Sequence, residues 1–68
     1  MLVTVNGDER ELESGATVAH LVGQMGARAD GRGVAVALAT EVVPRSEWPT
    51  TVLSAGDRVE VLIAVQGG

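Results

Sequence analysis

The sequence contains no cysteine and a single histidine, His20, among its 68 residues. Without thiols, the chain can form neither a disulfide framework nor a thiolate zinc site. His20 has no second histidine to complete a ligand pair, and the carboxylates show no spacing typical of a site of their own. We therefore expect no metal. A domain this small must be held together by its aliphatic core, which an apolar fraction of 46% makes feasible.

Lysine is also absent, and five arginines stand against nine acidic residues, so the net charge is −4. This balance disfavours contacts with phosphates, and nucleic acid is not an expected partner. It suits docking onto a basic protein surface. The sequence lacks an apolar run of about 18 residues, so no membrane-spanning helix is expected. Residues 1–6 alternate like a strand and lack the basic start of a signal peptide. The default expectation is a cytoplasmic protein.

The first half of the chain predicts a hairpin followed by one short helix. Residues 2–6 alternate as a half-buried strand does, and Asn6-Gly7 is a strong signal for a tight turn into a polar return strand over 9–13, with Leu12 inward. Thr17 is placed to cap the helix, and Gly26 to end it. Four apolar residues share one helical face: Val18, Leu21, Val22 and Met25.

The second half predicts strands over 33–38, over 41–43 and over 58–65, with Pro44 ending the middle one. Ser46 is expected to cap a single turn that Pro49 ends, and Trp48, the only aromatic residue, to cover one end of the core. The order β-β-α-β-β-β predicts an α+β fold of the β-grasp type. In it, a mixed sheet of about five strands packs on one helix, and the last strand lies parallel to the first in the middle of the sheet. We expect residues 1–65 to form the domain and 66–68 a flexible tail.

No combination of side chains in the sequence predicts an active site. His20 falls off the apolar helical face and is interpreted as a solvated residue. Glu9, Glu11 and Glu13 alternate on the expected edge strand, which is typical of a solvated face rather than a catalytic carboxylate pair.

The remaining reactive group is the terminal carboxylate of Gly68. A carboxylate is ionised at neutral pH and is a poor electrophile, so it needs an enzyme that joins it to AMP. Because Gly67 and Gly68 carry no Cβ, they and Gln66 can thread into a narrow enzyme site.

Strand alternation also predicts a docking face. The valines of the expected central strands point to the helix, and the residues of opposite parity point to the open face of the sheet. An apolar outer face is unusual, because open faces normally carry polar residues, and it indicates a partner site. The expected patch consists of Leu2, Thr4, Ala35, Ala37, Leu62 and Ala64, of which we assign partner contacts to Leu62, Ala64, Ala35, Ala37 and Leu2.

Six segments carry a resemblance to a known family: 3–7, 15–18, 34–38, 41–48, 56–60 and 64–68. The most specific are Val-Pro-Arg-Ser-Glu-Trp over 43–48 and Ala-Val-Gln-Gly-Gly over 64–68. With these segments in register along the whole chain, the sequence resembles the ThiS family, the small sulfur carriers of thiamine biosynthesis. Similar proteins usually turn on Asn-Gly at the third hairpin, where this chain has Ala39-Thr40, which lacks a residue that readily adopts a positive φ.

The resemblance implies a ubiquitin-like β-grasp and a carrier that is not itself an enzyme and binds no cofactor. It implies that an E1-like, ThiF-like enzyme uses ATP to adenylate Gly68. Sulfur from a persulfide system then replaces AMP to give a thiocarboxylate, and a ThiG-like thiazole synthase takes up that sulfur.

Three alternatives remain open. One is a sulfur carrier for another pathway, such as molybdopterin synthesis. Another is a ubiquitin-like protein modifier, which could not form lysine-linked chains with itself because it has no lysine. The third is a passive interaction module.

Overall fold

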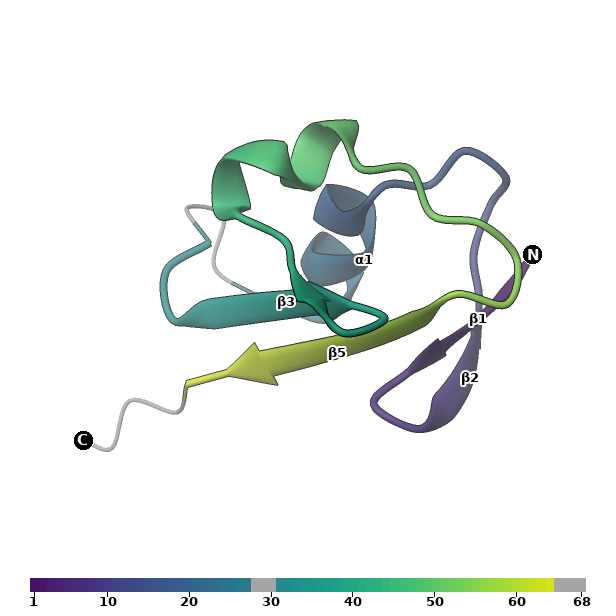
Figure 1. Cartoon of the computed structure of the whole chain (residues 1–68), viewed down its shortest axis with the longest axis horizontal. Coiled ribbons are helices and arrows are strands. Elements are labelled where there is room, and N and C mark those ends of the chain that lie inside the picture. The colour runs from purple at the N-terminus through teal and green to yellow at the C-terminus, as the bar shows by residue number, and fades with distance from the viewer. Residues whose placement is uncertain (28–30, 65–68) are drawn as a thin grey trace.

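The computed structural model describes residues 1–27 and 31–64 and contains a five-stranded mixed sheet with one α-helix in that part of the chain (Figure 1). The elements are β1 (Leu2–Val5), β2 (Asp8–Glu11), α1 (Val18–Gln24), β3 (Val34–Leu38), β4 (Glu41–Val42), the 3₁₀-helix η1 (Arg45–Thr50) and β5 (Arg58–Ile63). The strand order is β2-β1-β5-β3-β4, and both α1 and η1 lie on one side of the sheet (Figure 1). This is the α+β, β-grasp arrangement that the sequence predicts.

Strand β5 occupies the centre of the sheet. It pairs antiparallel with β3 over five residue pairs, from Val34 opposite Ile63 to Leu38 opposite Val59. On its other side it pairs parallel with β1, where Thr4 lies opposite Arg58. The last strand in the sequence is therefore inserted between two strands formed earlier in the chain.

Asn6 extends the parallel pairing beyond the point where β1 turns away. Its backbone N–H donates to the Val59 carbonyl at 3.0 Å. Its side-chain Oδ1 accepts from the Val61 N–H at 2.8 Å, and its Nδ2 donates to the Val61 carbonyl at 3.0 Å. The amide thus imitates the next peptide group of β1. The hairpin that follows needs a left-handed residue here, and Asn6 adopts φ 52°.

The core lies between the sheet and the two helices. β5 contributes Val59 and Val61, and the helix contributes one buried face, as the helical spacing predicts. A seven-residue helix is too short to be stable alone, so α1 depends on this packing. The buried apolar residues are Val3, Val5, Leu12, Ala16, Val18, Leu21, Val22, Val36, Val43, Trp48, Leu53, Val59 and Val61.

The α1 helix begins at Thr17, as expected, but with a partner that the sequence did not suggest. The Thr17 Oγ1 accepts from the His20 N–H, and the His20 Nδ1 accepts from the Thr17 N–H, each at 3.2 Å. His20 therefore takes the place that glutamate usually fills in a capping box.

Several boundaries differ from the prediction. The return strand covers Asp8–Glu11 rather than 9–13, and β5 ends at Ile63, while residue 65 lies outside the described residues. Ser46 is not the cap of the turn before Trp48. That segment is a 3₁₀-helix over Arg45–Thr50 with Pro44 at its cap position, and Pro49 lies inside this helix instead of ending it.

Replacing Asn6 by glycine tests the amide bridge to β5. Glycine accepts φ 52° but leaves the Val61 N–H and carbonyl without their partners, so we expect the free energy of unfolding to fall by about 1–3 kcal/mol. The matched control is Ala39→Gly, at a position with φ 57° in the β3–β4 turn. Relief of that strain should raise stability by about 1 kcal/mol or less. Urea unfolding gives the change in the free energy of unfolding for each variant. If both variants lose stability, or both gain it, the bridge from Asn6 to Val61 is not the stabilising contact proposed here.

Candidate functional site

The candidate site is the end of β5, from which the chain continues towards Gly68. The backbone is held there up to Ala64, whose N–H donates to the Gly33 carbonyl at 2.6 Å. Gln66, Gly67 and Gly68, the residues expected to thread and react, lie outside the described residues. The structure thus defines the base from which they extend: the end of β5, which is paired with β3 up to Ile63 and is held on the β1 side up to Val61.

The open face of the sheet carries an apolar half and a charged half. Opposite residues of paired strands share a face, so Leu62 lies beside Ala35, and Ala37 lies between Glu60 and Val42. Leu62 is 70% exposed and Val42 is 76% exposed. We call this apolar half the exit patch; it consists of Ala35, Ala37, Val42, Leu62 and Ala64.

Leu2 and Thr4 do not belong to the exit patch. Thr4 lies opposite Arg58, which is four residues, or about 13 Å, along β5 from Leu62, and Leu2 lies further in the same direction. Arg58 and Glu60 share the open face with Leu62 and stand between the two groups. The expectation of one continuous patch is therefore wrong, because it considered the apolar residues of that parity and not the charged ones.

Val42 was missed by the sequence analysis. Its strand has only two residues, Glu41 and Val42, which is too short to show an alternation. The pairing of Val42 with Ala37 is what assigns it to the open face.

A shallow hollow of about 380 Å³ lies where β3 begins and β5 ends. It is lined by Gly33, Val34, Ala35, Leu62, Ile63 and Ala64. A larger hollow of about 880 Å³ lies between α1 and the loop after β2, and its lining includes Met1, Glu13 and His20. Of these two hollows, the smaller one adjoins the end of β5.

The side chains with conventional chemistry have structural roles or face solvent. His20 is exposed, as expected, and its Nδ1 is engaged in the helix cap. Trp48 is 5% exposed, and its Nε1 donates to the Val43 carbonyl at 2.9 Å, so its ring is a core element rather than a surface anchor. Glu9, Glu11 and Glu13 are all exposed.

Residues 1–27 and 31–64 contain no group of three or more histidines and carboxylates that could hold a metal ion. Within the same residues, no helix is long and apolar enough to cross a membrane.

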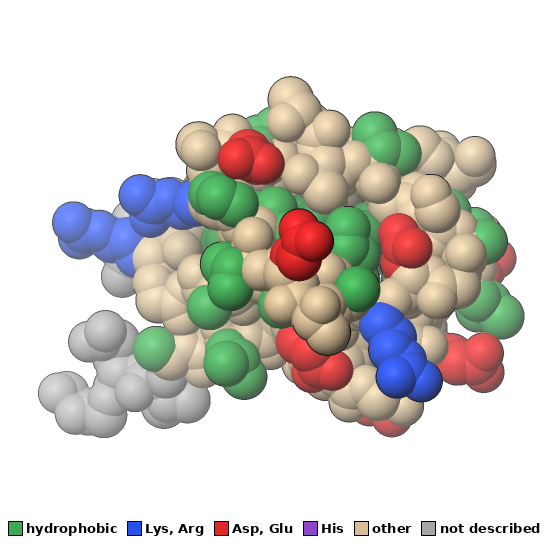
Figure 2. All heavy atoms as spheres, viewed as in Figure 1, with side chains coloured by type: hydrophobic (Ala, Val, Ile, Leu, Met, Phe, Trp, Pro, Cys, Tyr) green, Lys and Arg blue, Asp and Glu red, His purple; other side chains and the backbone are tan. Residues whose placement is uncertain are grey.

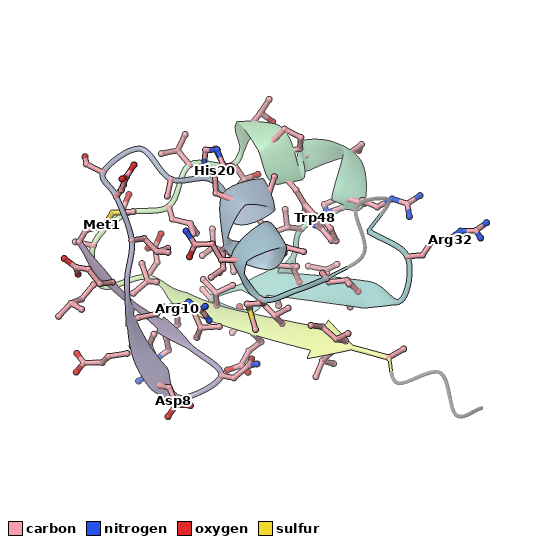
Figure 3. The ribbon with its side chains drawn as sticks, turned by 180° about the vertical axis from the view of Figure 1, so that it is seen from behind. Met1, Asp8, Arg10, His20, Arg32 and Trp48 are labelled. Carbon is pink, nitrogen blue, oxygen red and sulfur yellow. The ribbon has the colours of Figure 1, made fainter. Side chains whose placement is uncertain are left out.

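Two arginines lie at the same end of the molecule as the end of β5. Arg32 comes directly before Gly33, whose carbonyl holds Ala64 (Figure 3). The Arg45 side chain passes over Gly31, because a Cβ added to that glycine would lie 2.5 Å from the Arg45 Cδ. Figure 2 shows basic side chains gathered at this end. The two arginines lie on separate segments of the sequence, and the packing of η1 on Gly31 brings them to the same end of the molecule.

Comparison with known proteins identifies relatives over the whole chain. Residues 3–68 match the model of a family described as the ThiS family. The crystal structure of a thiamine biosynthesis protein (ThiS) from Geobacter metallireducens is 31% identical, with a TM-score of 0.79 and full coverage of both chains. A solution structure of a thiamine biosynthesis protein from the same organism is 30% identical, with a TM-score of 0.82, and covers all of this chain and 88% of the other.

A longer relative matches as well. A protein of Paramagnetospirillum magneticum described as thiazole synthase is 35% identical over 68 residues. All of this chain is covered, but it spans only 20% of that protein's length.

Gly31 and Gly33 form a matched pair for testing how closely the segment before β3 packs against Trp48. Their φ angles are 71° and 73°, so alanine is strained equally at both, by about 1–2 kcal/mol. At Gly33 the new methyl group would meet Ala64 at 3.5 Å, an ordinary contact, whereas at Gly31 it would lie 2.9 Å from the buried ring of Trp48. We expect Gly31→Ala to be more destabilising than Gly33→Ala by about 1–3 kcal/mol. Thermal melts measure the difference, and equal losses would rule out the close packing at Gly31.

Proposed function

Because the chain belongs to the ThiS family, we propose that it is a sulfur carrier of thiamine biosynthesis whose Gly68 carboxylate becomes a thiocarboxylate. The observation that carries the proposal is the family match over residues 3–68, which includes the glycine pair following the central strand. The protein acts as a co-substrate of other enzymes. Its reacting atoms belong to the tail, while the folded domain supplies recognition.

The proposed chemistry has three steps. The Gly68 carboxylate attacks the α-phosphorus of ATP on an E1-like enzyme, which forms an acyl adenylate and releases pyrophosphate. The terminal sulfur of a persulfide then attacks the acyl carbon, and AMP leaves. A second thiol finally cleaves the sulfur–sulfur bond, so that a disulfide forms between the two thiols and the thiocarboxylate is released.

The position of Gly68 in the sequence suits this chemistry, because it separates the reacting carboxylate from the folded domain. Gly68 lies four residues beyond Ala64, so a fully extended segment reaches about 13–14 Å past the last described backbone hydrogen bond. Two glycines at the tip carry no side chain to obstruct a narrow channel. The carrier can therefore present its carboxylate deep inside an enzyme while its sheet stays outside.

We propose a thiazole synthase as the acceptor of the sulfur. The longer relative described as thiazole synthase includes a stretch similar to this entire chain. Joining a carrier to its acceptor in one polypeptide raises their effective concentration without any new contact. The presence of a carrier-like stretch in that protein supports the proposal that this chain, as a separate protein, donates its sulfur to a thiazole synthase.

The exit patch is the proposed docking surface for both enzymes. It adjoins the end of β5, so a partner that binds the tail is brought against Leu62 and Ala64. Single exposed leucines are common, but here Leu62 lies beside Ala35, with Ala37 and Val42 in the next row. A contiguous apolar surface at the base of a reactive tail favours a protein contact.

Conversion of Gly68 is tested by intact-mass measurement. After incubation with ATP, a matching activating enzyme and a persulfide donor, the mass should rise by the difference between one sulfur and one oxygen atom. The matched control lacks Gly68; its melting temperature should be unchanged, and its mass should stay constant. An unchanged mass of the full chain with an enzyme set that is active on its own carrier would contradict the proposal. Attachment to another protein would favour a modifier instead.

The exit patch is tested by Leu62→Arg. If Leu62 lies near the interface centre, affinity for either enzyme should fall by about 1–3 kcal/mol. Stability should change by about 0.5 kcal/mol or less, because the side chain is exposed. Leu2→Arg is the control. Leu2 is 49% exposed on the same face but lies outside the exit patch, so the affinity of this variant for either enzyme should be unchanged. Titration calorimetry measures the affinity of each variant, and a thermal melt measures its stability. Equal losses of affinity for the two substitutions would exclude the exit patch as the docking surface.

A further inference from the structure

The charges of this protein are separated along the molecule. The return strand and the loop after it carry Asp8, Glu9, Glu11 and Glu13, all exposed, at the end opposite to that reached by β5 (Figure 1). Arg32 is exposed at the end where β5 finishes (Figure 3), and Arg45, also exposed, packs on the neighbouring Gly31. Although the net charge of the chain is −4, two of the four described arginines lie at this end, where Glu47 of η1 is also exposed.

The position of the two arginines is set by backbone packing. Gly31 is buried against Trp48 and Arg45, and the next two residues are Arg32 and Gly33. Because Gly33 accepts the hydrogen bond from Ala64, Arg32 is directly adjacent to the residue that anchors the end of β5. Arg32 thus belongs to the segment that holds the end of β5, and the Arg45 side chain packs on that segment at Gly31.

We infer that Arg32 and Arg45 form a positive collar around the tail base, which recognises an acidic rim at the mouth of the tail-binding channel of the partner. This inference rests on the proposed sulfur-carrier function and adds to it the charge of the partner surface. The acidic end then points away from the partner, so the molecule approaches with its tail first.

The collar acts on the partner surface and not on the reacting phosphate. Gly68 lies four residues beyond Ala64, about 13–14 Å when extended, whereas Arg32 is attached beside the base of the tail. Charges at the rim of an interface change mainly the association rate, and this effect weakens as salt screens it. The collar should therefore affect the encounter and leave turnover of the bound carrier unchanged.

The chain offers a matched pair of charge reversals. Arg32→Glu with Arg45→Glu and Arg10→Glu with Arg58→Glu each remove two positive and add two negative charges, which takes the net charge from −4 to −8. The second pair lies on β2 and at the start of β5, away from the tail base. The two double variants differ only in where the charge is placed.

The experiment measures association of each variant with the activating enzyme by stopped-flow fluorescence, at about 0.05 M and about 0.5 M salt. We expect the collar variant to associate about tenfold more slowly than the parent at low salt, with most of the difference lost at high salt. The association rate of the control variant with Arg10→Glu and Arg58→Glu should fall several-fold less than that of the collar variant. At saturating enzyme, conversion of Gly68 should proceed at the parent rate in both.

Three results would overturn the inference. Equal slowing of both variants would show that net charge alone matters, and unchanged or faster association of the collar variant would show a partner rim that is not acidic. A loss of turnover at saturation with normal association would place the arginines on the adenylate instead. The proposed function is tested separately, since it fails only if the parent chain is not converted. If a reversed variant does not fold, Arg32→Gln with Arg45→Gln takes its place, with roughly half the logarithmic effect expected.

Discussion

The insertion of β5 between β1 and β3 is the constraint on which the rest of this structure depends. Its valines close the core beneath α1, and its pairings connect the N-terminal hairpin to the second half of the sheet. Without β5, the two hairpins would share no hydrogen bonds in the sheet. Since β5 is the last strand of the described residues, the sheet is complete only when nearly all of them are in place, and the residues of β5 that pair with β1 are more than 50 positions away along the chain.

This arrangement also suits the proposed function, in which the folded domain carries the reacting group on its C-terminal tail. The strand that leads to the tail is bonded on both sides up to Val61 and to β3 up to Ile63, so the sheet determines where the chain leaves it. Stability depends on buried aliphatic side chains, and in the proposed function reactivity depends on a carboxylate beyond them. The two can change independently, which suits the proposed carrier, since it is recognised by two enzymes in that proposal.

Recognition in this scheme uses two properties of one end of the molecule. The exit patch supplies apolar area, which contributes to affinity, and the positive collar supplies charge, which acts on the rate and orientation of encounter. The charged half of the open face, with Arg58 and Glu60, borders the patch and limits how far a partner can extend over the sheet without burying charge.

The sequence by itself determined the fold class, the element order, the helix with its Thr17 cap and the parity of each long strand. These follow from local patterns, because the periods of 2 and 3.6 residues and the turn residue Asn6 act over neighbouring positions. The family resemblance was likewise carried by short segments, and the comparison over residues 3–68 confirmed it.

Only the tertiary structure decided which residues of one parity lie side by side. Leu2 and Leu62 share a face but are separated by the register of β1 on β5, and Val42 joins the exit patch through its pairing with Ala37. The bridge from Asn6 to Val61 and the meeting of Arg45 with Gly31 join segments distant in sequence. Such contacts depend on how strands are aligned and how η1 packs, and a pattern within one segment carries no information about either.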